Sequence, residues 1–304
     1  MGERKELVII GSGPAGLSAA VYAQRAMIDQ LVVEKEIFSG GQIVNTERID
    51  NYLGLYGENG YDLAMKFRSH ADQLQVPFME AGVAKVEDKG DYKEIQLENG
   101  QTLEAGAVVI ATGARHRLLG VPGEKEFTGA GVSYCATCDG AFYKDKTVAV
   151  VGGGDVALED ALYLANVCKK VYLIHRRDEL RGTKILQENV FASDKIEFLK
   201  SCQVSEIKGD GLVQQIDVCD RDGNHKDYDI DGIFIAVGML PVNEAVKDLV
   251  DLNPGGYIVA GEDCRTSCPG VYAIGDIRTK SLRQVATAVA DGAVVITSYE
   301  QDHQ

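Results

Sequence analysis

The chain has 304 residues, 45% of them hydrophobic and 25% charged, which is an ordinary composition for a soluble globular protein of about two domains. A formal net charge of −15 disfavours nucleic acid and anionic membranes as partners. No apolar stretch approaches the roughly 20 residues of a membrane helix, and the charged start does not resemble a signal peptide, so we expect a cytoplasmic protein.

The first predicted elements form a dinucleotide-binding motif. A buried strand over Leu7–Ile10 leads into the glycine turn Gly11–Gly16, a helix over Leu17–Met27 and a second strand over Leu31–Glu34. The first glycine permits the tight turn, the second lets the backbone approach a pyrophosphate, and the third lets helix and strand pack closely. The pyrophosphate would lie at the N-terminus of the helix.

Two further strands are expected before the middle of the chain. The alternating segment Glu94–Leu97 predicts an antiparallel strand packed beside the parallel sheet. The apolar run Ala107–Gly113 predicts the strand and turn that close the first nucleotide-binding domain. A connector containing proline, Gly120–Gly123, follows it.

Cys135 and Cys138 have the Cys-x-x-Cys spacing of a redox dithiol. A structural zinc site would need four ligands, and the only other close pair, Cys264 and Cys268, begins 126 residues later, so we expect no metal. Asp139 follows the second cysteine, where its carboxyl would pass a proton to a departing thiolate or act as a turn residue before Gly140. The remaining cysteines, Cys168, Cys202 and Cys219, are expected to be small core residues.

A second copy of the motif follows the cysteines. It consists of a strand over Thr147–Val151, the turn Gly152–Ala157, a helix over Leu158–Asn166 and a strand over Lys170–His175. Eighteen residues separate Gly16 from Glu34 and Ala157 from His175 alike. Glu34 and His175 are therefore expected at the same place, the end of the second strand.

This matched position predicts which nucleotide each copy binds. An acid such as Glu34 accepts hydrogen bonds from ribose hydroxyls and would repel a 2′-phosphate, which favours the ADP half of FAD. The second copy has His175, Arg176 and Arg177 there, with Arg181 four residues further on. Arginine side chains match a phosphate dianion, which favours NADPH. The alternative is a solvated basic cluster after a strand.

The last part of the chain is predicted to return to the first domain. Gln214–Val218 reads as an antiparallel strand, and Gly232–Gly238 repeats the closing strand and turn of the first copy. Only 63 residues follow Pro241, too few for a third domain. They contain a strand ending in Gly275-Asp276 and a helix that opens at Arg283–Ala286 and reaches about residue 299.

The predicted fold class is therefore α/β, with two Rossmann-like, three-layer ββα nucleotide-binding domains, the second inserted into the first. We expect an FAD-binding domain over residues 1–117 and 244–304, and an NADPH-binding domain carrying the dithiol over residues 118–243.

Taken together, these motifs closely resemble those of the bacterial low-molecular-weight, NADPH-dependent thioredoxin reductases, over essentially the whole chain. The catalytic residues that the resemblance implies are Cys135, Cys138 and Asp139. The FAD-binding residues predicted from the motifs and the resemblance are Gly11, Gly13, Pro14, Ala15, Gly16, Glu34, Gly41, Gln42, Asn51, Ala111, Thr112, Gly113, Gly275, Asp276, Arg283, Gln284, Val285 and Ala286. The NADPH-binding residues predicted in the same way are Gly152, Gly154, Asp155, Val156, Ala157, His175, Arg176, Arg177 and Arg181.

The resemblance also implies a homodimer and a thioredoxin as the disulfide substrate. It further implies that the second domain rotates in each turnover, because the dithiol and the nicotinamide share that domain and must each reach one flavin. Cys138, next to Asp139, is expected to face the flavin. One position departs from the family, because Val156 stands where a serine is common, so a hydroxyl near the pyrophosphate is lost.

Three alternatives stay open at this point. A flavoenzyme serving a peroxiredoxin or a glutaredoxin-like dithiol would carry an extra N-terminal dithiol domain, whereas this chain starts on the predicted flavin strand. A ferredoxin–NADP reductase would lack the Cys-x-x-Cys. A nucleotide sensor without enzymatic activity would leave Cys135, Cys138 and Asp139 without a purpose.

Overall fold

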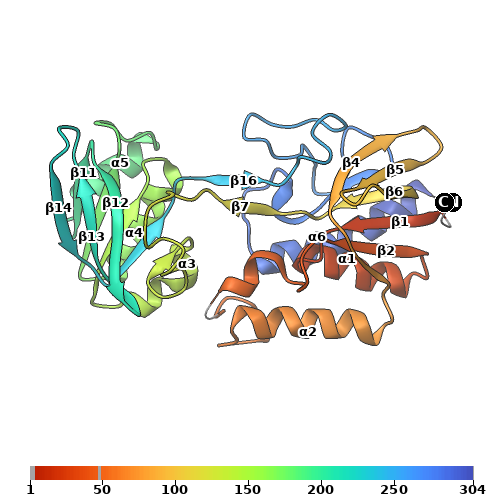
Figure 1. Cartoon of the computed structure of the whole chain (residues 1–304), viewed down its shortest axis with the longest axis horizontal. Helices are drawn as coiled ribbons and strands as arrows, with labels where there is room; N and C mark the ends of the chain where they lie inside the picture. Colours follow the sequence, from red (N-terminus) through yellow and green to blue (C-terminus); the bar gives the residue numbers. More distant parts are fainter. Residues whose placement is uncertain (1–3, 47–48, 304) are drawn as a thin grey trace. The chain divides into compact units, whose positions relative to one another are not determined.

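A computed structural model describes residues 4–46 and 49–303 (Figure 1). The chain divides into two compact units, one made of Met1–Arg115 and Leu240–Gln304, the other of His116–Met239. The two segments that join them are β7 (Ala114–His116) and β16 (Met239–Pro241), which pair as a two-stranded ladder. The inserted unit ends earlier than residue 243, because Val242 N donates to Gly113 O at 3.0 Å, within the first unit.

The first unit contains one seven-stranded sheet. Its strands run in the order β3 (Phe78–Glu80), β2 (Gln30–Glu34), β1 (Lys5–Ile10), β6 (Thr102–Ile110), β5 (Lys93–Leu97) and β4 (Val83–Asp88), with β17 (Val271–Ala273) on the end of β6. The strands β1, β2, β3, β6 and β17 are parallel. Antiparallel β5, expected beside this sheet, is instead bonded into it, because long β6 pairs with β5 through its first half and with β17 through its second.

Helices cover one face of this sheet and β-structure with loops covers the other. The helices are α1 (Pro14–Arg25), α2 (Gly60–Gln73) and α6 (Val285–Asp302), with the short 3-10 turns η1 (Gly41–Asn45) and η3 (Gly275–Ile277). Leu7 and Ile9 of β1 belong to the core on the helix side, and Val8 and Ile10 to the core that includes Ile95 of β5. This alternation is what a strand buried on both faces requires.

Helix α1 differs from its prediction at both ends for local reasons. It begins at Pro14, three residues before the expected start, because proline is favoured in the first turn of a helix, where its missing N–H costs nothing. It ends at Arg25, because Met27 adopts a left-handed φ of 60° that a continuing helix does not allow.

The second unit has a parallel sheet and a separate antiparallel sheet. The parallel sheet runs in the order β11 (Ile196–Lys200), β10 (Lys170–His175), β9 (Thr147–Val151), β15 (Gly232–Ile235) and β8 (Val132–Ser133). The antiparallel sheet consists of β12 (Gln203–Asp210), β13 (Leu212–Cys219) and β14 (His225–Asp229). The helical segments are α3 (Ala136–Asp139), η2 (Gly140–Tyr143), α4 (Asp155–Val167) and α5 (Lys184–Ala192). Val148 and Val150 pack against helices, and Ala149 and Val151 against the antiparallel sheet.

The two units repeat one architecture, which confirms the predicted α/β fold class with layered nucleotide-binding units. The parallel order β3-β2-β1-β6-β17 matches β11-β10-β9-β15-β8. Only the source of the fifth strand differs, because β17 comes after the inserted unit in the sequence and β8 comes at its start.

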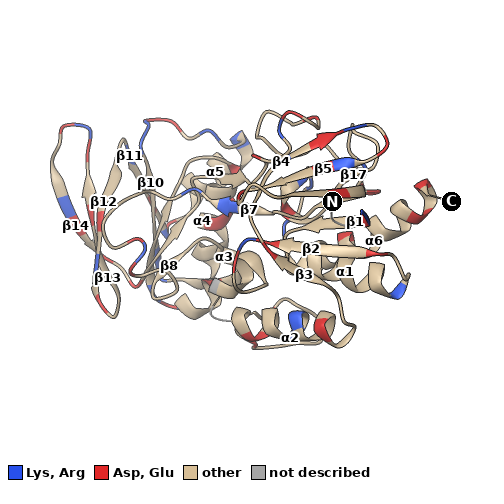
Figure 2. Cartoon of the chain, turned by 45° about the vertical axis from the view of Figure 1, so that its right-hand side comes forward, with Lys and Arg blue, Asp and Glu red and all other residues tan. Residues whose placement is uncertain are grey.

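Acidic and basic residues are spread along the elements of both units (Figure 2). In the part of the chain that the structure describes, none of the helices is long and apolar enough to span a bilayer.

Candidate functional site

The two glycine turns occupy matching positions in their sheets. Ile10 pairs with Val33 in one unit and Val151 with Ile174 in the other. Gly11 N donates to Val33 O at 2.9 Å, and Gly152 N donates to Ile174 O at 3.0 Å. Glu34 and His175 each follow the last paired residue, so the predicted equivalence of these two positions is confirmed.

The first glycine turn is tightly packed at Gly11 and Gly16 and open at Gly13. A Cβ on Gly11 would lie 2.5 Å from Ala111 O, and one on Gly16 would lie 2.0 Å from Gly11 O, so neither position accepts a side chain. At Gly13 a Cβ would meet nothing within 4 Å. Gly13 is also the N-cap of α1, so no side chain covers the first N–H groups of the helix at this position. The helix N-terminus and the open glycine therefore fit a pyrophosphate.

Glu34 is held by the middle residue of the turn. Its Oε2 accepts a hydrogen bond from Ser12 N at 2.6 Å and another from Ser12 Oγ at 2.7 Å. Its Oε1 accepts from Glu36 N at 3.0 Å. These bonds fix the carboxylate at the end of β2, where it can accept from a ribose hydroxyl. The part of Ser12 was not predicted from the sequence.

Other residues predicted for the first nucleotide lie in the same unit and meet one another in two places. Gly41 lies against the first turn, since a Cβ on it would be 3.6 Å from the Gly13 Cα, and Gln42 follows it in η1. Asn51 Nδ2 donates to Gln284 Oε1 at 3.0 Å. Gln284, rather than Arg283, caps α6, and the first turn of that helix contains Val285 and Ala286.

The segment after β6 joins the turn to the C-terminal region. Ala111 N donates to Ile10 O at 2.8 Å, which places Ala111 directly beneath Gly11. Thr112 Oγ1 donates to Val242 O at 2.6 Å, and Val242 N donates to Gly113 O. Ala111 and Gly113 make these contacts through the backbone and Thr112 through its hydroxyl, and together they hold the segment that packs against the first glycine turn.

Asp276 lies in η3 and has a buried carboxylate oxygen. Its Oδ1 makes no hydrogen bond with any described residue. The pKa of the Asp276 carboxyl is raised above its usual range, mainly because the group is buried. Asp291 raises it further, and Lys280 and Arg283 offset part of this rise. Arg283 lies over the ring of Tyr257 at 4.0 Å and donates to Asp276 O at 3.4 Å. A buried acceptor of this kind fits a hydroxyl donor on a bound cofactor.

The middle of the second turn packs against His175, which has the position that Glu34 has in the first unit. A Cβ on Gly153, the middle residue, would lie 2.5 Å from the ring of His175. Gly154 is open and caps α4, as Gly13 caps α1. Asp155 Oδ1 accepts from Thr183 N at 2.7 Å, which ties the loop after β10 to the start of α4. Val156, the next residue of α4, is 63% exposed.

The cationic side chains of the second site point away from the rest of the described chain. Arg176, Arg177 and Arg181 are exposed, and none of their guanidinium groups bonds or pairs with another described residue. Arg181 N donates to Gly153 O at 2.6 Å, which places this residue at the turn. His175 is buried; burial lowers its pKa, and the three arginines lower it further. The imidazole is therefore neutral near pH 7, and the positive charge comes from the arginines alone.

Cys135 and Cys138 form a disulfide, as predicted, with an S–S distance of 2.11 Å. Cys135 is the N-cap of the short helix α3, and Asp139 ends that helix. Ser133, the last residue of β8, donates from its Oγ to Asp139 Oδ2 at 2.5 Å and accepts from Cys135 N at 3.1 Å. Ser133 therefore fixes the Asp139 carboxylate relative to the backbone of the first cysteine. The sequence indicated no such role for it.

A disulfide and two glycine turns in one chain are the features of a known family, and comparison with known proteins identifies it. The family model of pyridine nucleotide-disulphide oxidoreductases matches residues 5–292. The chain belongs to this family.

The most similar relatives include proteins called thioredoxin reductase. The one from Listeria monocytogenes is 43% identical over 95% of this chain and 91% of its own length, and the one from Bacillus subtilis is 42% identical over 99% and 96%. The crystal structure of thioredoxin reductase from Streptococcus pyogenes is 45% identical and gives a TM-score of 0.93 over 99% of this chain and 98% of its own.

The other cysteines of this family member do not pair with each other. Cys264 and Cys268, the other close pair in the sequence, are both free and buried. Burial raises the pKa of the Cys264 thiol to about 12, and that of the Cys168 thiol to about 11. Such thiols are poor nucleophiles at neutral pH. Cys202 and Cys219 were expected in the core, but both are only partly buried.

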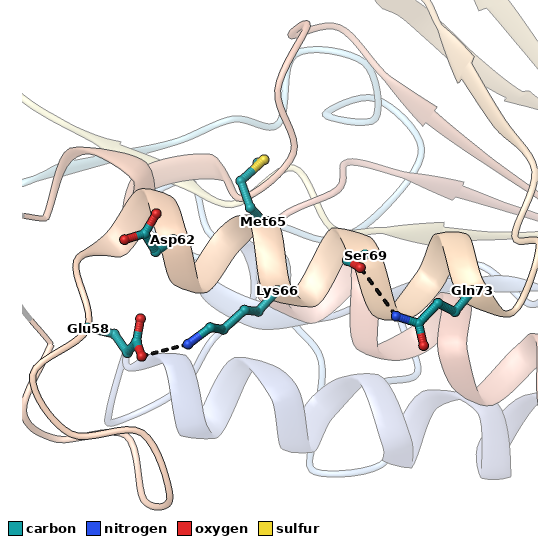
Figure 3. A pocket seen from close by; sticks show the side chains of 6 residues that line it. All are labelled: Glu58, Asp62, Met65, Lys66, Ser69 and Gln73. Carbon is teal, nitrogen blue, oxygen red and sulfur yellow. Dashed lines mark hydrogen bonds and ion pairs between the residues drawn. The ribbon is translucent and has the colours of Figure 1, made fainter.

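A shallow hollow of about 600 Å³ lies along α2 (Figure 3). It is lined by Glu58, Asp62, Met65, Lys66, Ser69 and Gln73. Lys66 pairs with Glu58 at 2.6 Å, and Gln73 Nε2 donates to Ser69 Oγ at 3.4 Å. The carboxylate of Asp62 accepts from Asn59 Nδ2. None of the lining residues belongs to the predicted nucleotide sites. Within residues 4–46 and 49–303, no group of three His, Cys, Asp or Glu side chains is placed to hold a metal ion.

Proposed function

We propose that this protein is an NADPH-dependent, FAD-containing reductase of a thioredoxin disulfide. One observation carries the proposal: the Cys135–Cys138 disulfide belongs to the same unit as the arginine-rich second glycine turn. The similarity to proteins called thioredoxin reductase over nearly the whole chain supports the same substrate.

FAD is the nucleotide we assign to the first unit. Glu34, fixed by Ser12, would accept from its ribose, the N-terminus of α1 at Gly13 would hold its pyrophosphate, and the buried oxygen of Asp276 would accept from a further hydroxyl. All three groups lie in one unit, so a single extended cofactor would satisfy them.

NADPH is the nucleotide we assign to the second unit. The exposed guanidinium groups of Arg176, Arg177 and Arg181 are free to bind a 2′-phosphate. His175 adds a neutral imidazole, whose Nε2 makes no hydrogen bond with a described residue and would donate or accept according to its tautomer. No carboxylate stands at this position to repel the phosphate.

The cysteines and Asp139 carry out the disulfide chemistry. FAD, when bound, supplies the means of passing two electrons from NADPH to a disulfide. On reduction the Cys135–Cys138 bond breaks to one thiolate and one thiol, with Asp139 supplying the proton and Cys138 on the side of the flavin. The thiolate then attacks the substrate disulfide to form a mixed disulfide, and the second cysteine releases the reduced substrate, restoring the Cys135–Cys138 bond.

We also propose that the second unit rotates between half-reactions. The chain passes between the units only at β7 and β16, which are three residues long each. Two short crossings of this kind are typical of a hinge, with motion in microseconds to milliseconds. A homodimer is proposed as well, and this proposal rests on the similarity to thioredoxin reductases over nearly the whole chain.

The deciding experiment mixes the purified protein with NADPH and oxidised thioredoxin. We expect a yellow protein that consumes one NADPH for each pair of thioredoxin thiols formed, and that consumes NADH much more slowly. Parallel reactions with a peroxiredoxin, a glutaredoxin and a ferredoxin test the alternatives. Rapid bleaching of the flavin with no thiol formed on thioredoxin would contradict the proposal.

A further inference from the structure

Ser133 is a buried polar residue at the end of β8, two positions before the disulfide. The residue is only 5% exposed. The strand β8 pairs in parallel with β15, and Ser133 lies opposite Phe234 in that pairing. The sheet of the second unit therefore fixes its backbone. Because a buried hydroxyl costs free energy unless it is hydrogen-bonded, the partners of this hydroxyl indicate what it does.

The hydroxyl of Ser133 joins the two ends of the short helix α3. Its Oγ accepts a hydrogen bond from Cys135 N at 3.1 Å and donates one to Asp139 Oδ2 at 2.5 Å. Cys135 is the N-cap of α3, and Asp139 is its last residue. Asp139 N also donates to Cys135 O at 3.1 Å. The Asp139 carboxyl is thus tied to the backbone of the first cysteine by side-chain and main-chain bonds, and Ser133 anchors both to the sheet.

A second acceptor lies within reach of the same hydroxyl. Cys135 O is 3.4 Å from Ser133 Oγ and can accept its hydrogen. When Asp139 is ionised, the hydroxyl donates to Oδ2, which is the nearer acceptor. When Asp139 is protonated on Oδ2, the hydroxyl can accept a hydrogen bond from that proton and donate to Cys135 O instead. Ser133 is therefore able to hold the Asp139 carboxyl in both of its protonation states.

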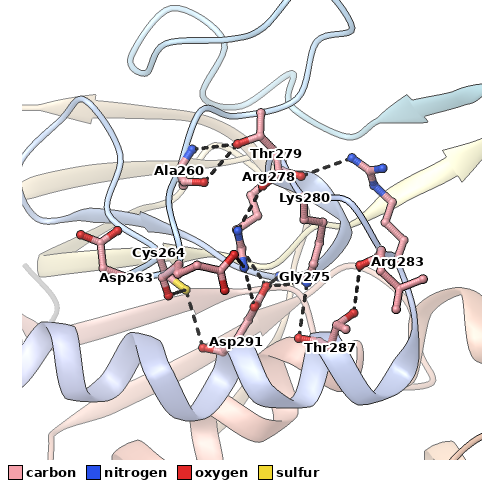
Figure 4. Close-up of polar contacts among 12 residues, drawn as sticks. Ala260, Asp263, Cys264, Gly275, Arg278, Thr279, Lys280, Arg283, Thr287 and Asp291 are labelled. Atoms are coloured by element: carbon pink, nitrogen blue, oxygen red, sulfur yellow. Dashed lines mark hydrogen bonds and ion pairs between the residues drawn. The ribbon is translucent and has the colours of Figure 1, made fainter.

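A carboxylate of the first unit shows a different way of holding such a group. Asp291 of α6 accepts from Arg278 Nη2 at 2.8 Å and from Lys280 Nζ at 2.9 Å (Figure 4). Burial alone would raise the pKa of Asp291, but the hydrogen bonds from these two cations hold it below its ordinary value. Cations only donate, so they stabilise the carboxylate and not the acid. A hydroxyl that both donates and accepts suits a carboxyl that must gain and lose a proton.

We propose that Ser133 is a positioning residue for the proton donor of the disulfide: it holds the Asp139 carboxyl in one place before and after the proton is transferred. The inference rests on the proposed function, in which Asp139 is the proton donor to the disulfide and NADPH supplies the two electrons. These electrons break the S–S bond, one sulfur takes the Asp139 proton, and the other is left as a thiolate. The hydroxyl of Ser133 then turns from Cys135 O to the new carboxylate. Ser133 keeps its own proton, so it acts only through Asp139.

The test follows two reactions of the purified full-length protein. The first is the reduction of thioredoxin by NADPH, which gives kcat and the KM for thioredoxin. The second is the opening of the Cys135–Cys138 disulfide by dithiothreitol, a dithiol that replaces both NADPH and thioredoxin. Alkylation of the new thiols and mass spectrometry measure its rate. The thermal midpoint of each variant reports folding.

Ser133→Ala removes the hydroxyl, and Ser133→Thr keeps it. Ser201→Ala is the matched control, because Ser201 is another serine of the second unit whose hydroxyl donates to a carboxylate, that of Asp178. We expect Ser133→Ala to lower kcat and the rate of disulfide opening about tenfold, because the acid is no longer held in place. The KM for thioredoxin should not change, since the acid acts on the chemical step. Ser133→Thr and Ser201→Ala should keep rates close to those of the wild type.

An Asp139→Asn background separates positioning from packing. Asp139→Asn alone should lower both rates about 10²-fold, the scale of a lost general acid. Because Ser133 acts only through Asp139, Ser133→Ala should add no further loss in this background. A tenfold loss that persists there would indicate a structural role and overturn the inference. Equal losses for Ser133→Ala and Ser133→Thr at an unchanged thermal midpoint would also overturn it.

The two reactions distinguish failure of this inference from failure of the proposed function. Wild-type protein that does not reduce thioredoxin, while its opening by dithiothreitol still depends on Ser133, would overturn the proposed function alone. Normal thioredoxin reduction by the wild type, together with wild-type rates for Ser133→Ala in both reactions, would overturn the inference alone.

Discussion

The two glycine turns make the same backbone hydrogen bond, but the residue at the end of the second strand is an acid, Glu34, in one unit and a histidine, His175, in the other. Gly11 and Gly152 donate to equivalent carbonyl groups of β2 and β10. A side chain on either glycine would clash with the carbonyl group of the residue that follows β6 or β15. The next residue of the turn differs. Ser12 donates twice to Glu34, whereas Gly153 leaves room for the ring of His175.

In both units the middle residue of the turn contacts the side chain at the end of the second strand. An acid at the strand end uses a donor in the middle of the turn, which Ser12 supplies through its Oγ and N. A histidine at the same place needs the volume that a side chain on Gly153 would fill. Exchange of Glu34 and His175 alone would therefore not exchange the two nucleotides.

The largest effect is expected at the disulfide of the second unit, which lies at α3 just after β8. Cys135→Ser or Cys138→Ser should lower thioredoxin reduction by about 10³-fold or more, because neither hydroxyl can form or resolve a disulfide. Both nucleotide turns remain intact, so NADPH should still bleach the flavin in a stopped-flow measurement.

Cys202→Ser is the matched control, since Cys202 is a free and partly buried cysteine of the same unit. It should retain wild-type turnover. Substantial thioredoxin reduction by a protein lacking both Cys135 and Cys138 would show that the disulfide is not on the electron path.

Gly16→Ala tests the tighter of the two turns. A Cβ there would lie 2.0 Å from Gly11 O, a backbone atom that cannot move aside cheaply. Helix α1 cannot retreat either, because a Cβ on Gly292 of α6 would already lie 2.6 Å from Ala15 O. We expect a cost of about 3 kcal/mol in folding free energy, the scale of core overpacking, and loss of bound flavin on gel filtration.

The control for this substitution is Gly13→Ala, where a Cβ would meet no protein atom within 4 Å. It should leave the thermal midpoint nearly unchanged and weaken only the retention of flavin. Equal thermal midpoints for Gly16→Ala and the wild type would mean that the packing of α1 on this turn is looser than the structure describes.

Arg176→Met and Arg177→Met test the nucleotide assignment of the second turn. Each should weaken NADPH binding by about 1.5–3 kcal/mol, the scale of a hydrogen bond to a charged group, and NADH binding much less. Steady-state kinetics with both coenzymes measure this as a rise in KM for NADPH. Equal losses for the two coenzymes would mean that the arginines do not read the 2′-phosphate.

Much of this comparison could be predicted from sequence because it depends on local spacing. The interval from Gly16 to Glu34 fixes a strand-turn-helix-strand register, and the structure has the same register. The charge of His175 could not be predicted, because it depends on burial against Gly153. The role of Ser133 depends on a side-chain contact with Asp139, 6 positions away, and no motif encodes this contact.

The smallest effect is expected at the counterpart of Gly16 in the second turn. Ala157 is fully buried in the core of the second unit and lies on α4. Its methyl group is accommodated because Gly152 has none, since a Cβ on Gly152 would lie 2.5 Å from it. Ala157→Gly should therefore cost about 1–2 kcal/mol in folding free energy, because it loses both helix propensity and the burial of one methyl group.

NADPH affinity should be unchanged in this variant, because the lost methyl group faces the core rather than the open side of the turn at Gly154. A thermal melt and an NADPH titration of Ala157→Gly separate the two quantities. If affinity fell tenfold while stability held, the third position of the turn would act on the nucleotide and not on packing. The equivalence of Gly16 and Ala157 as packing positions would then be broken.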